Sequence, residues 1–204
     1  MILVLAYWIY LLAVTSIAGI TISKTLKIKG IHPVLTIFIG SFGITLFASF
    51  WSIFGNLGGY FEGALIGLCI ASLAFFKRDF SVFLISLKAK ISSFSTLPKV
   101  LFFTVLFMAA AKCASLPYLI DNESYYIQSI KWLDTYGFVP GLGNLHPFLA
   151  QTSGWHILQS ATNLDMLFPY FNDISGFFLV LGNLYAFDAL SQWLKTKNNS
   201  YLIA

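Results

Sequence analysis

The chain has 204 residues, of which 58% are hydrophobic and only 10% carry a charge. A soluble domain usually carries about a quarter charged residues, so this composition excludes an ordinary water-soluble globular protein and favours one whose surface faces lipid. The net charge of +4 does not indicate nucleic-acid binding, because the basic residues are not gathered in one soluble part of the chain. Cys69 and Cys113 lie within apolar runs without metal-ligand spacing, and we interpret them as small hydrophobic residues.

A membrane span needs roughly 20 mostly apolar residues, and five runs of this sequence are long enough to test as spans. The first run has no charge and lacks the basic start of a secretory signal, so we expect it to remain as a span. The pattern predicts an all-α, polytopic transmembrane helix bundle. The expected spans cover residues 2–22, 31–54 and 60–76 (the three helices of an N-terminal part, 1–76), 100–116 and 174–194.

Two further segments are predicted on the cytoplasmic side. Residues 77–99 are too polar to span, but their apolar residues recur at helical spacing, which predicts an amphipathic helix in the cytoplasmic interface held by membrane lipid. A cytoplasmic helix packed on other loops is the alternative. Residues 195–204 are predicted to form a cytoplasmic turn and the start of a truncated span, so we expect the chain to be a fragment of a longer protein.

The basic residues predict the orientation. Ten of the twelve lie in three segments that alternate onto the same side of the membrane. Basic residues near span ends favour the cytoplasmic side, so we expect the N-terminus and the long segment 117–173 to lie outside, in a bacterial inner membrane. The ten residues are Lys24, Lys27, Lys29, Lys77, Arg78, Lys88, Lys90, Lys99, Lys195 and Lys197.

The outer segment 117–173 holds five of the eight acidic residues. A helical pattern runs from Asn122 to Tyr136, and Gly137 is expected to end it. A turn-rich loop follows, and Pro147 suits the first turn of a second helix that continues through Leu158. We expect both short helices, which are rich in aromatic residues, to lie along the membrane surface.

Asp121 and Glu123 follow the fourth span within a few residues. One interpretation makes Asp121 a helix N-cap, with Glu123 in the first turn. The other makes Asp121 a general base beside the membrane, with a second carboxylate close by. The two roles are compatible, because a cap also fixes a carboxylate in place.

Other polar residues of the sequence also have alternative interpretations. His146 and His156 could bind a metal ion with the acids, but solvated or capping histidines explain them as well. Lys112 is expected to extend from the fourth span to the outer interface, and the alternative makes it a partner for a lipid phosphate. Asn183 and Asp188 in the fifth span are either functional polar groups or, for Asp188, a residue that reaches the cytoplasmic rim. Gly141-Leu-Gly143 lacks the third glycine and the preceding strand of a dinucleotide-binding loop.

Two stretches of the outer segment, 121–132 (DNESYYIQSIKW) and 136–146 (YGFVPGLGNLH), resemble the first outer loop of bacterial GT-C superfamily glycosyltransferases that act in surface-polysaccharide assembly. The resemblance implies an acidic residue just after a span, two membrane-surface helices, and polyprenyl-phosphate-linked sugar donors. It gives Asp121 the position of the catalytic acid and Glu123 that of a second carboxylate. It also makes Tyr125, Gln128, Lys112 and His146 candidates for substrate binding.

We therefore expect a membrane glycosyltransferase, or a part of one, that transfers a sugar from a polyprenyl-phosphate-linked donor to an acceptor glycan or lipid on the outer face. A divalent metal ion is the one cofactor left open, and no nucleic-acid partner is expected. Because the family has further spans that hold the lipid tail, we expect the 204-residue chain alone to lack transfer activity. The alternative is a non-catalytic subunit, or a transporter of the flippase kind, in surface-polysaccharide assembly.

Overall fold

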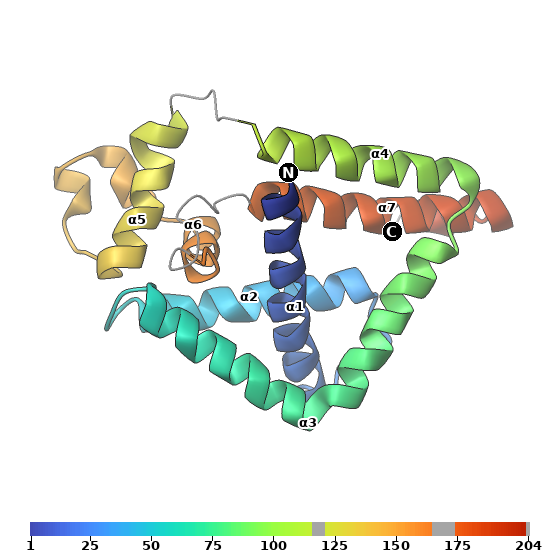
Figure 1. The fold of residues 1–204 in the computed structure, drawn as a ribbon, viewed down its shortest axis with the longest axis horizontal. Helices are drawn as coiled ribbons and strands as arrows, with labels where there is room; N and C mark the ends of the chain where they lie inside the picture. Colours follow the sequence, from blue (N-terminus) through green and yellow to red (C-terminus); the bar gives the residue numbers. More distant parts are fainter. Residues whose placement is uncertain (116–120, 165–173, 203–204) are drawn as a thin grey trace.

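The computed structural model describes residues 1–115, 121–164 and 174–202, without the side chains of Asn122, Glu123 and Leu202. These residues form seven α-helices and no strand, which confirms the predicted all-α fold (Figure 1). Five of the described helices are long and apolar enough to cross a membrane, as predicted. They are α1 (Ile2–Thr25), α2 (Pro33–Trp51), α3 (Gly59–Ser92), α4 (Thr96–Cys113) and α7 (Ile174–Thr196).

Helices α1 and α2 cross steeply and pack with their backbones nearly in contact (Figure 1). A Cβ atom on Gly40 would lie 1.7 Å from the carbonyl oxygen of Thr15, and one on Gly19 would lie 1.9 Å from that of Thr36. Thr15 and Gly19, like Thr36 and Gly40, are four residues apart. This spacing of small residues permits close helix packing where water supplies no driving force.

Helix α3 joins two elements that the sequence separates. It continues through the predicted third span, bends at Phe76 (φ −115°, ψ 22°), and runs on to Ser92. Its second half buries Phe83 and Leu87 but leaves Val82 and Ile85 58% and 69% exposed. The amphipathic segment is therefore a continuation of α3, and an open apolar face remains on it. Helix α4 begins at Thr96, four residues before the predicted start of the fourth span.

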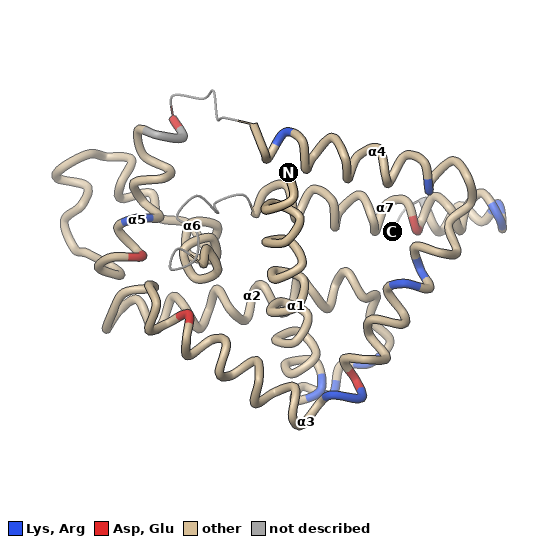
Figure 2. The backbone as a smooth tube through the Cα atoms, in the orientation of Figure 1, with Lys and Arg blue, Asp and Glu red and all other residues tan. Residues whose placement is uncertain are grey.

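Helices α4 and α7 lie side by side and antiparallel (Figure 1). The short helices α5 (Ile127–Tyr136) and α6 (Gly154–Ala161) lie at the left-hand end of the molecule. The basic residues that follow α1, occupy the second half of α3 and end α7 lie along its lower and right-hand edge (Figure 2). At that edge the Lys24 Nζ atom lies 2.5 Å from Asp79 Oδ1 and connects α1 to α3.

The first predicted surface helix, Asn122 to Tyr136, has the predicted extent. Its first part, Asn122–Tyr126, is π-helical, and only the remainder is the α-helix α5. Gly137 ends it with a positive φ of 73°, as predicted. The second surface helix was predicted wrongly. Pro147–Ala150 forms only a 3-10 turn, and α6 begins separately at Gly154, because Ser153 caps a new helix there.

Two predicted segments, the outer segment 117–173 and the C-terminal segment 195–204, are described only in part. The ends of the predicted outer segment, 117–120 and 165–173, lie outside the described residues, and so do the last two residues of the chain. At the predicted start of a truncated span, Asn199–Leu202 forms a 3-10 turn.

Candidate functional site

Asp121 is the first described residue after the gap that follows α4. It is exposed and helical, and the described helical segment that leads into α5 follows it directly. The carboxylate is therefore held beside this segment and open to solvent.

A group of ring side chains follows Asp121 along this surface, and we call it the aromatic surface (Tyr125, Tyr126, His146, Phe148 and His156). The Tyr125 ring lies 4.3 Å from that of Tyr126 and 4.9 Å from that of Phe148, measured between ring centroids. His146 lies 5.3 Å from Phe148, and Tyr126 lies 5.6 Å from His156. These contacts join the helical segment after Asp121 to the turn that holds His146 and Phe148, and to α6, which holds His156.

Asp121 acts on the aromatic surface through its charge. The pKa of the Tyr125 hydroxyl is raised to about 12, first by its hydrogen bond with Tyr126, then by burial and by the negative charge of Asp121. Tyr125 therefore stays protonated at neutral pH. It can donate a hydrogen bond but cannot serve as a base.

His156 fastens the aromatic surface to α6. The His156 Nδ1 atom accepts the backbone N–H of Ser153 at 3.2 Å, and the His156 N–H donates to Ser153 Oγ, which makes a capping box. Because Nδ1 accepts, the proton of the neutral ring is on Nε2. Burial lowers the pKa of His156, which also favours the neutral ring.

The structure brings together some of the predicted site residues. Tyr125 and His146 meet through Phe148, and Tyr125 is within the electrostatic reach of Asp121. Gln128 is exposed on α5, and Lys112 is exposed on the last turn of α4. The side chain of Glu123 lies outside the described part of the chain. Among the described residues, no three His, Cys, Asp or Glu side chains are grouped so that they could hold a metal ion.

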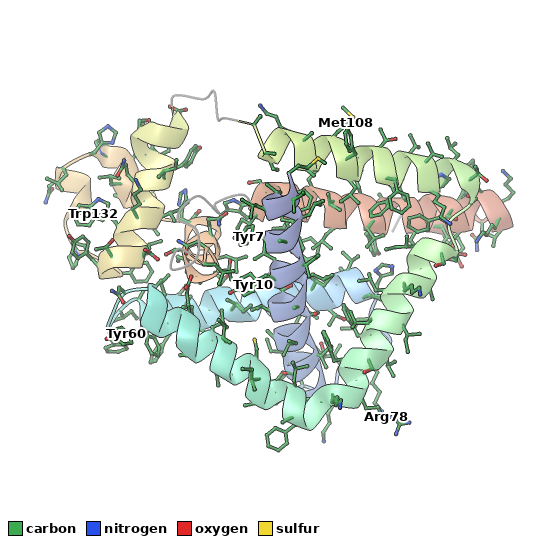
Figure 3. All side chains as sticks on the ribbon, in the orientation of Figure 1. Tyr7, Tyr10, Tyr60, Arg78, Met108 and Trp132 are labelled. Carbon is green, nitrogen blue, oxygen red and sulfur yellow. The ribbon has the colours of Figure 1, made fainter. Side chains whose placement is uncertain are left out.

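A buried polar connection leads from α6 into the core. Gln159 is 2% exposed, and its amide donates to the Tyr7 hydroxyl at 2.9 Å while accepting the backbone N–H of Ile174 at 2.9 Å. Tyr7 and Tyr10 lie on α1 in the middle of the molecule (Figure 3). Gln159 thus connects α1, α6 and the start of α7.

Beside the aromatic surface lies a cavity of about 350 Å³. Its wall is formed by α5, by the loop 137–143 and by the segment 149–152. None of the six predicted site residues lines it, and no charged side chain is among its lining residues. The α5 residues that line it are Ser129, Trp132 and Leu133.

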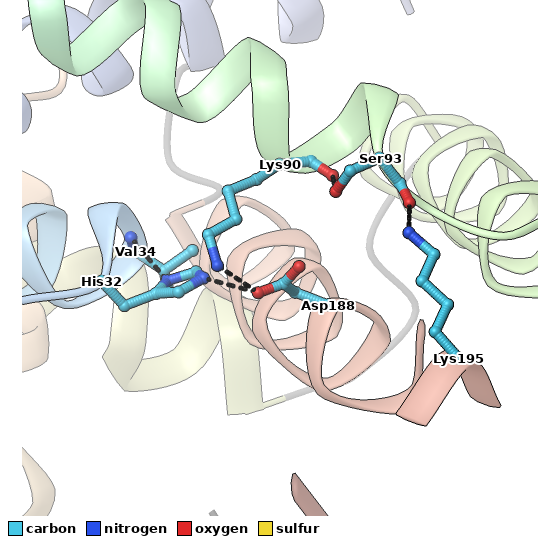
Figure 4. Close-up of polar contacts among 6 residues, drawn as sticks. All are labelled: His32, Val34, Lys90, Ser93, Asp188 and Lys195. Atoms are coloured by element: carbon cyan, nitrogen blue, oxygen red, sulfur yellow. Dashed lines mark hydrogen bonds and ion pairs between the residues drawn. The ribbon is translucent and has the colours of Figure 1, made fainter. Parts of the chain in front are cut away.

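A second polar group lies at the opposite, basic edge of the molecule. Asp188 on α7 is 5% exposed, and its Oδ2 atom lies 2.7 Å from Lys90 Nζ and 3.3 Å from His32 Nε2 (Figure 4). The His32 Nδ1 atom accepts the backbone N–H of Val34 and so caps α2. The imidazole is therefore neutral, with its Nε2–H donated to Asp188. We call these three residues the Asp188 cluster.

The sequence indicates Asp188 as a polar residue of the fifth span, but it does not indicate that Lys90 and His32 are its partners. The signal for His32 was present, because a histidine directly before Pro33 stands where a helix cap is expected. Ser129, Trp132 and Gln159 gave no signal, because only the folded α5–α6 segment brings them to a cavity or into the core.

The fold and these polar groups define an all-α protein with five helices of membrane-spanning length. The family described as a domain of unknown function (DUF8201) matches residues 1–204, the full length of the sequence, and the chain belongs to this family. A comparison with curated proteins and one with solved structures find no match.

Proposed function

We propose that this protein takes part in sugar transfer at the outer face of a bacterial cytoplasmic membrane. The donor would be a polyprenyl-phosphate-linked sugar, and the acceptor a glycan or a lipid. The observation that carries the proposal is the position of Asp121: an exposed carboxylate in the first described turn of the segment after α4, beside a cluster of aromatic rings. Its resemblance to the first outer loop of GT-C glycosyltransferases supports the same assignment.

The proposal requires that the α5–α6 segment lie outside the cytoplasm and that the N-terminus do so too. Support comes from the ten basic residues of the three alternating segments, because cations near span ends favour the cytoplasmic side. Those segments lie along the edge away from α5 and α6 (Figure 2). A separation of this kind is what the orientation needs.

In the proposed reaction, the Asp121 carboxylate accepts the proton of the acceptor hydroxyl as that oxygen attacks the anomeric carbon of the donor sugar. The bond between the anomeric carbon and the phosphate oxygen breaks, and polyprenyl phosphate leaves with the bonding electrons. Lys112 would attract the anionic leaving group. Tyr125, which stays protonated, would donate a hydrogen bond, and the exposed rings of the aromatic surface would contact the sugar or the first isoprene units.

Substitution of Asp121 by Asn tests this role. Asn keeps the size of the side chain and still serves a helix start, but it cannot accept the proton. We expect turnover to fall by roughly two orders of magnitude, measured as transfer of labelled sugar from a lipid donor in membrane vesicles. Asp79→Asn removes an acid from the opposite edge and is the matched control. Unchanged turnover in Asp121→Asn would contradict the proposal.

One observation favours a second function, that of a non-catalytic subunit in polysaccharide assembly. The cavity of the α5–α6 segment has no titratable side chain among its lining residues, so it can bind a molecule but supplies no acid or base. A subunit of this kind predicts that Asp121→Asn supports normal polysaccharide in cells, whereas closing the cavity does not. The two functions therefore predict opposite results for Asp121→Asn.

A further inference from the structure

The cavity between α5 and the glycine-rich loop has the size of a small-molecule site. Its volume of about 350 Å³ lies within the range of roughly 300–1,000 Å³ that is usual for ligand pockets. Trp132 contributes an aromatic ring to its wall. Gly141 and Gly143 are exposed, and they lack side chains that would cover the peptide groups of the loop there.

Ser129 supplies an unused hydrogen-bonding group in this wall. Its side chain is 2% exposed, and its Oγ atom has no hydrogen-bond partner among the described residues. Thr15 of α1, Ser41 of α2 and Ser52 just after α2 instead donate to the carbonyl four residues earlier, whereas Ser23 and Ser160 are, like Ser129, buried without a hydrogen-bond partner among the described residues. A buried polar atom without a partner costs roughly 1–3 kcal/mol, so a ligand or a water molecule that reached the Ser129 hydroxyl from the cavity would remove that cost.

The chemistry of the wall restricts what that ligand is. No charged side chain is among the lining residues, so nothing there would compensate a phosphate or a carboxylate. A pure hydrocarbon chain would leave the hydroxyls of Ser129 and Thr152 without partners. A ligand with one apolar face and several hydroxyl groups satisfies both conditions. Its C–H face would pack on the Trp132 ring, and its hydroxyls would bond Ser129, Thr152 and the loop backbone.

We propose that this cavity binds a neutral sugar unit, and that in the proposed function this unit belongs to the acceptor. The assignment to the acceptor rests on the proposed function, because the donor sugar there carries a phosphate that the uncharged wall disfavours. Binding of a neutral sugar itself does not depend on Asp121, which is not among the residues that line the cavity.

The test is saturation-transfer-difference NMR on the full chain in lipid nanodiscs. The probes are the methyl glycosides of glucose, galactose, mannose and N-acetylglucosamine, with glucuronic acid as the charged comparison. We expect at least one neutral glycoside to bind and glucuronic acid to bind more weakly. Ser129→Ala should weaken binding roughly fivefold, the effect of one lost hydrogen bond. Trp132→Ala should weaken it roughly tenfold or more.

Matched variants separate the cavity from the rest of the surface. Ser124→Ala removes an exposed hydroxyl from the preceding turn, and Trp155→Phe changes a tryptophan outside the cavity, so both should bind as wild type does. Trp132→Phe keeps a ring if the alanine variant does not fold. Absence of binding by all four glycosides, or equal binding in wild type, Ser129→Ala and Trp132→Phe, would overturn the inference. Asp121→Asn should bind sugar normally, so a loss of transfer in that variant leaves the cavity inference intact. Failure of the glycosides to bind the wild-type chain would in turn overturn the cavity inference but leave the role of Asp121 in transfer untouched.

Discussion

Two buried or half-buried histidines serve in this chain as hydrogen-bond acceptors for the backbone. His32 accepts the N–H of Val34 at the start of α2, and His156 accepts that of Ser153 at the start of α6, each through Nδ1. A protonated imidazole has no acceptor atom. Both helix starts therefore depend on neutral histidine, although only His32 also donates to an acid.

This use of His156 predicts a dependence of stability on pH. Burial lowers the pKa of His156 below its ordinary value of about 6.5, so the unfolded chain binds the proton more readily than the folded one. The free energy of unfolding should then be highest above pH 6.5 and fall as the pH drops below it. The thermal unfolding temperature in detergent, measured from pH 7.5 to 5, reports this.

Two variants isolate the contribution of His156. His156→Gln keeps a capping-box side chain at the same helix position and should reduce the loss of stability between pH 6.5 and 5. His146→Gln changes an exposed histidine and should leave the pH profile as in wild type. Identical profiles for wild type and His156→Gln would rule out the capping role of the neutral ring.

The Asp188 cluster predicts unequal roles for two neighbouring lysines. Lys90 compensates the buried carboxylate of Asp188 at 2.7 Å, whereas Lys88 is exposed on the same helix. Lys90→Ala leaves a buried charge with only His32 as a partner, and we expect a loss on the order of 2 kcal/mol, since Lys90 is itself partly exposed. Lys88→Ala should change the stability by less than about 0.5 kcal/mol.

Thermal unfolding of the single and double variants in detergent measures this coupling. If the carboxylate is the cause, Asp188→Asn combined with Lys90→Ala should be less destabilised than the sum of the two single variants. Equal unfolding temperatures for Lys88→Ala and Lys90→Ala would show that the ion pair does not hold α3 against α7.

At the scale of helices, the pair α1–α2 depends on glycine at the crossing. Gly40→Ala would place a Cβ atom 1.7 Å from the Thr15 carbonyl oxygen, so the two backbones must separate. We expect a loss of about 1–3 kcal/mol in the free energy of unfolding, which is typical of overpacking. Gly67→Ala on α3 is the control, because a Cβ atom there meets no atom within 4 Å. An unchanged unfolding temperature for Gly40→Ala would contradict the close crossing.

The helices themselves were largely predictable from the sequence, and their junctions were not. Long apolar runs predict the five long helices, because a span through lipid needs about 20 apolar residues in helical form. The change from apolar to polar sequence after Phe76 suggests two helices where one continues, and the bend itself has no proline or glycine. Likewise, Pro147 predicts a helix start that occurs, but only as a 3-10 turn, because Ser153 offers a better cap six residues later.

The candidate site was predictable only where residues that are neighbours in the sequence form it. Asp121 and the aromatic residues of α5 follow one another in the chain, so the sequence suggests a surface with both. The cavity beside Trp132 and the buried Gln159–Tyr7 hydrogen bond join residues that lie far apart in sequence. Their meeting depends on how α5 and α6 pack, and no local pattern reports that.

At the scale of the whole molecule, two ends have different chemistry. The end with α5 and α6 carries Asp121, the aromatic surface and the uncharged cavity. The opposite edge carries the Asp188 cluster and most of the basic residues (Figures 2 and 4). Sugar transfer at the outer face requires the α5–α6 end to lie outside the cytoplasm and the basic edge to lie inside. The proposed function therefore depends on this orientation above all.

Cysteine labelling in spheroplasts tests this orientation most directly. Single cysteines at Asn144 and Lys88, both exposed, would be placed in a chain whose Cys69 and Cys113 are replaced by Ala and treated with a membrane-impermeant maleimide. We predict that the cysteine at 144 reacts in spheroplasts and that the cysteine at 88 reacts only after the membrane is disrupted. Reaction at 88 but not at 144 in spheroplasts would contradict the orientation and, with it, a transfer site on the outer face.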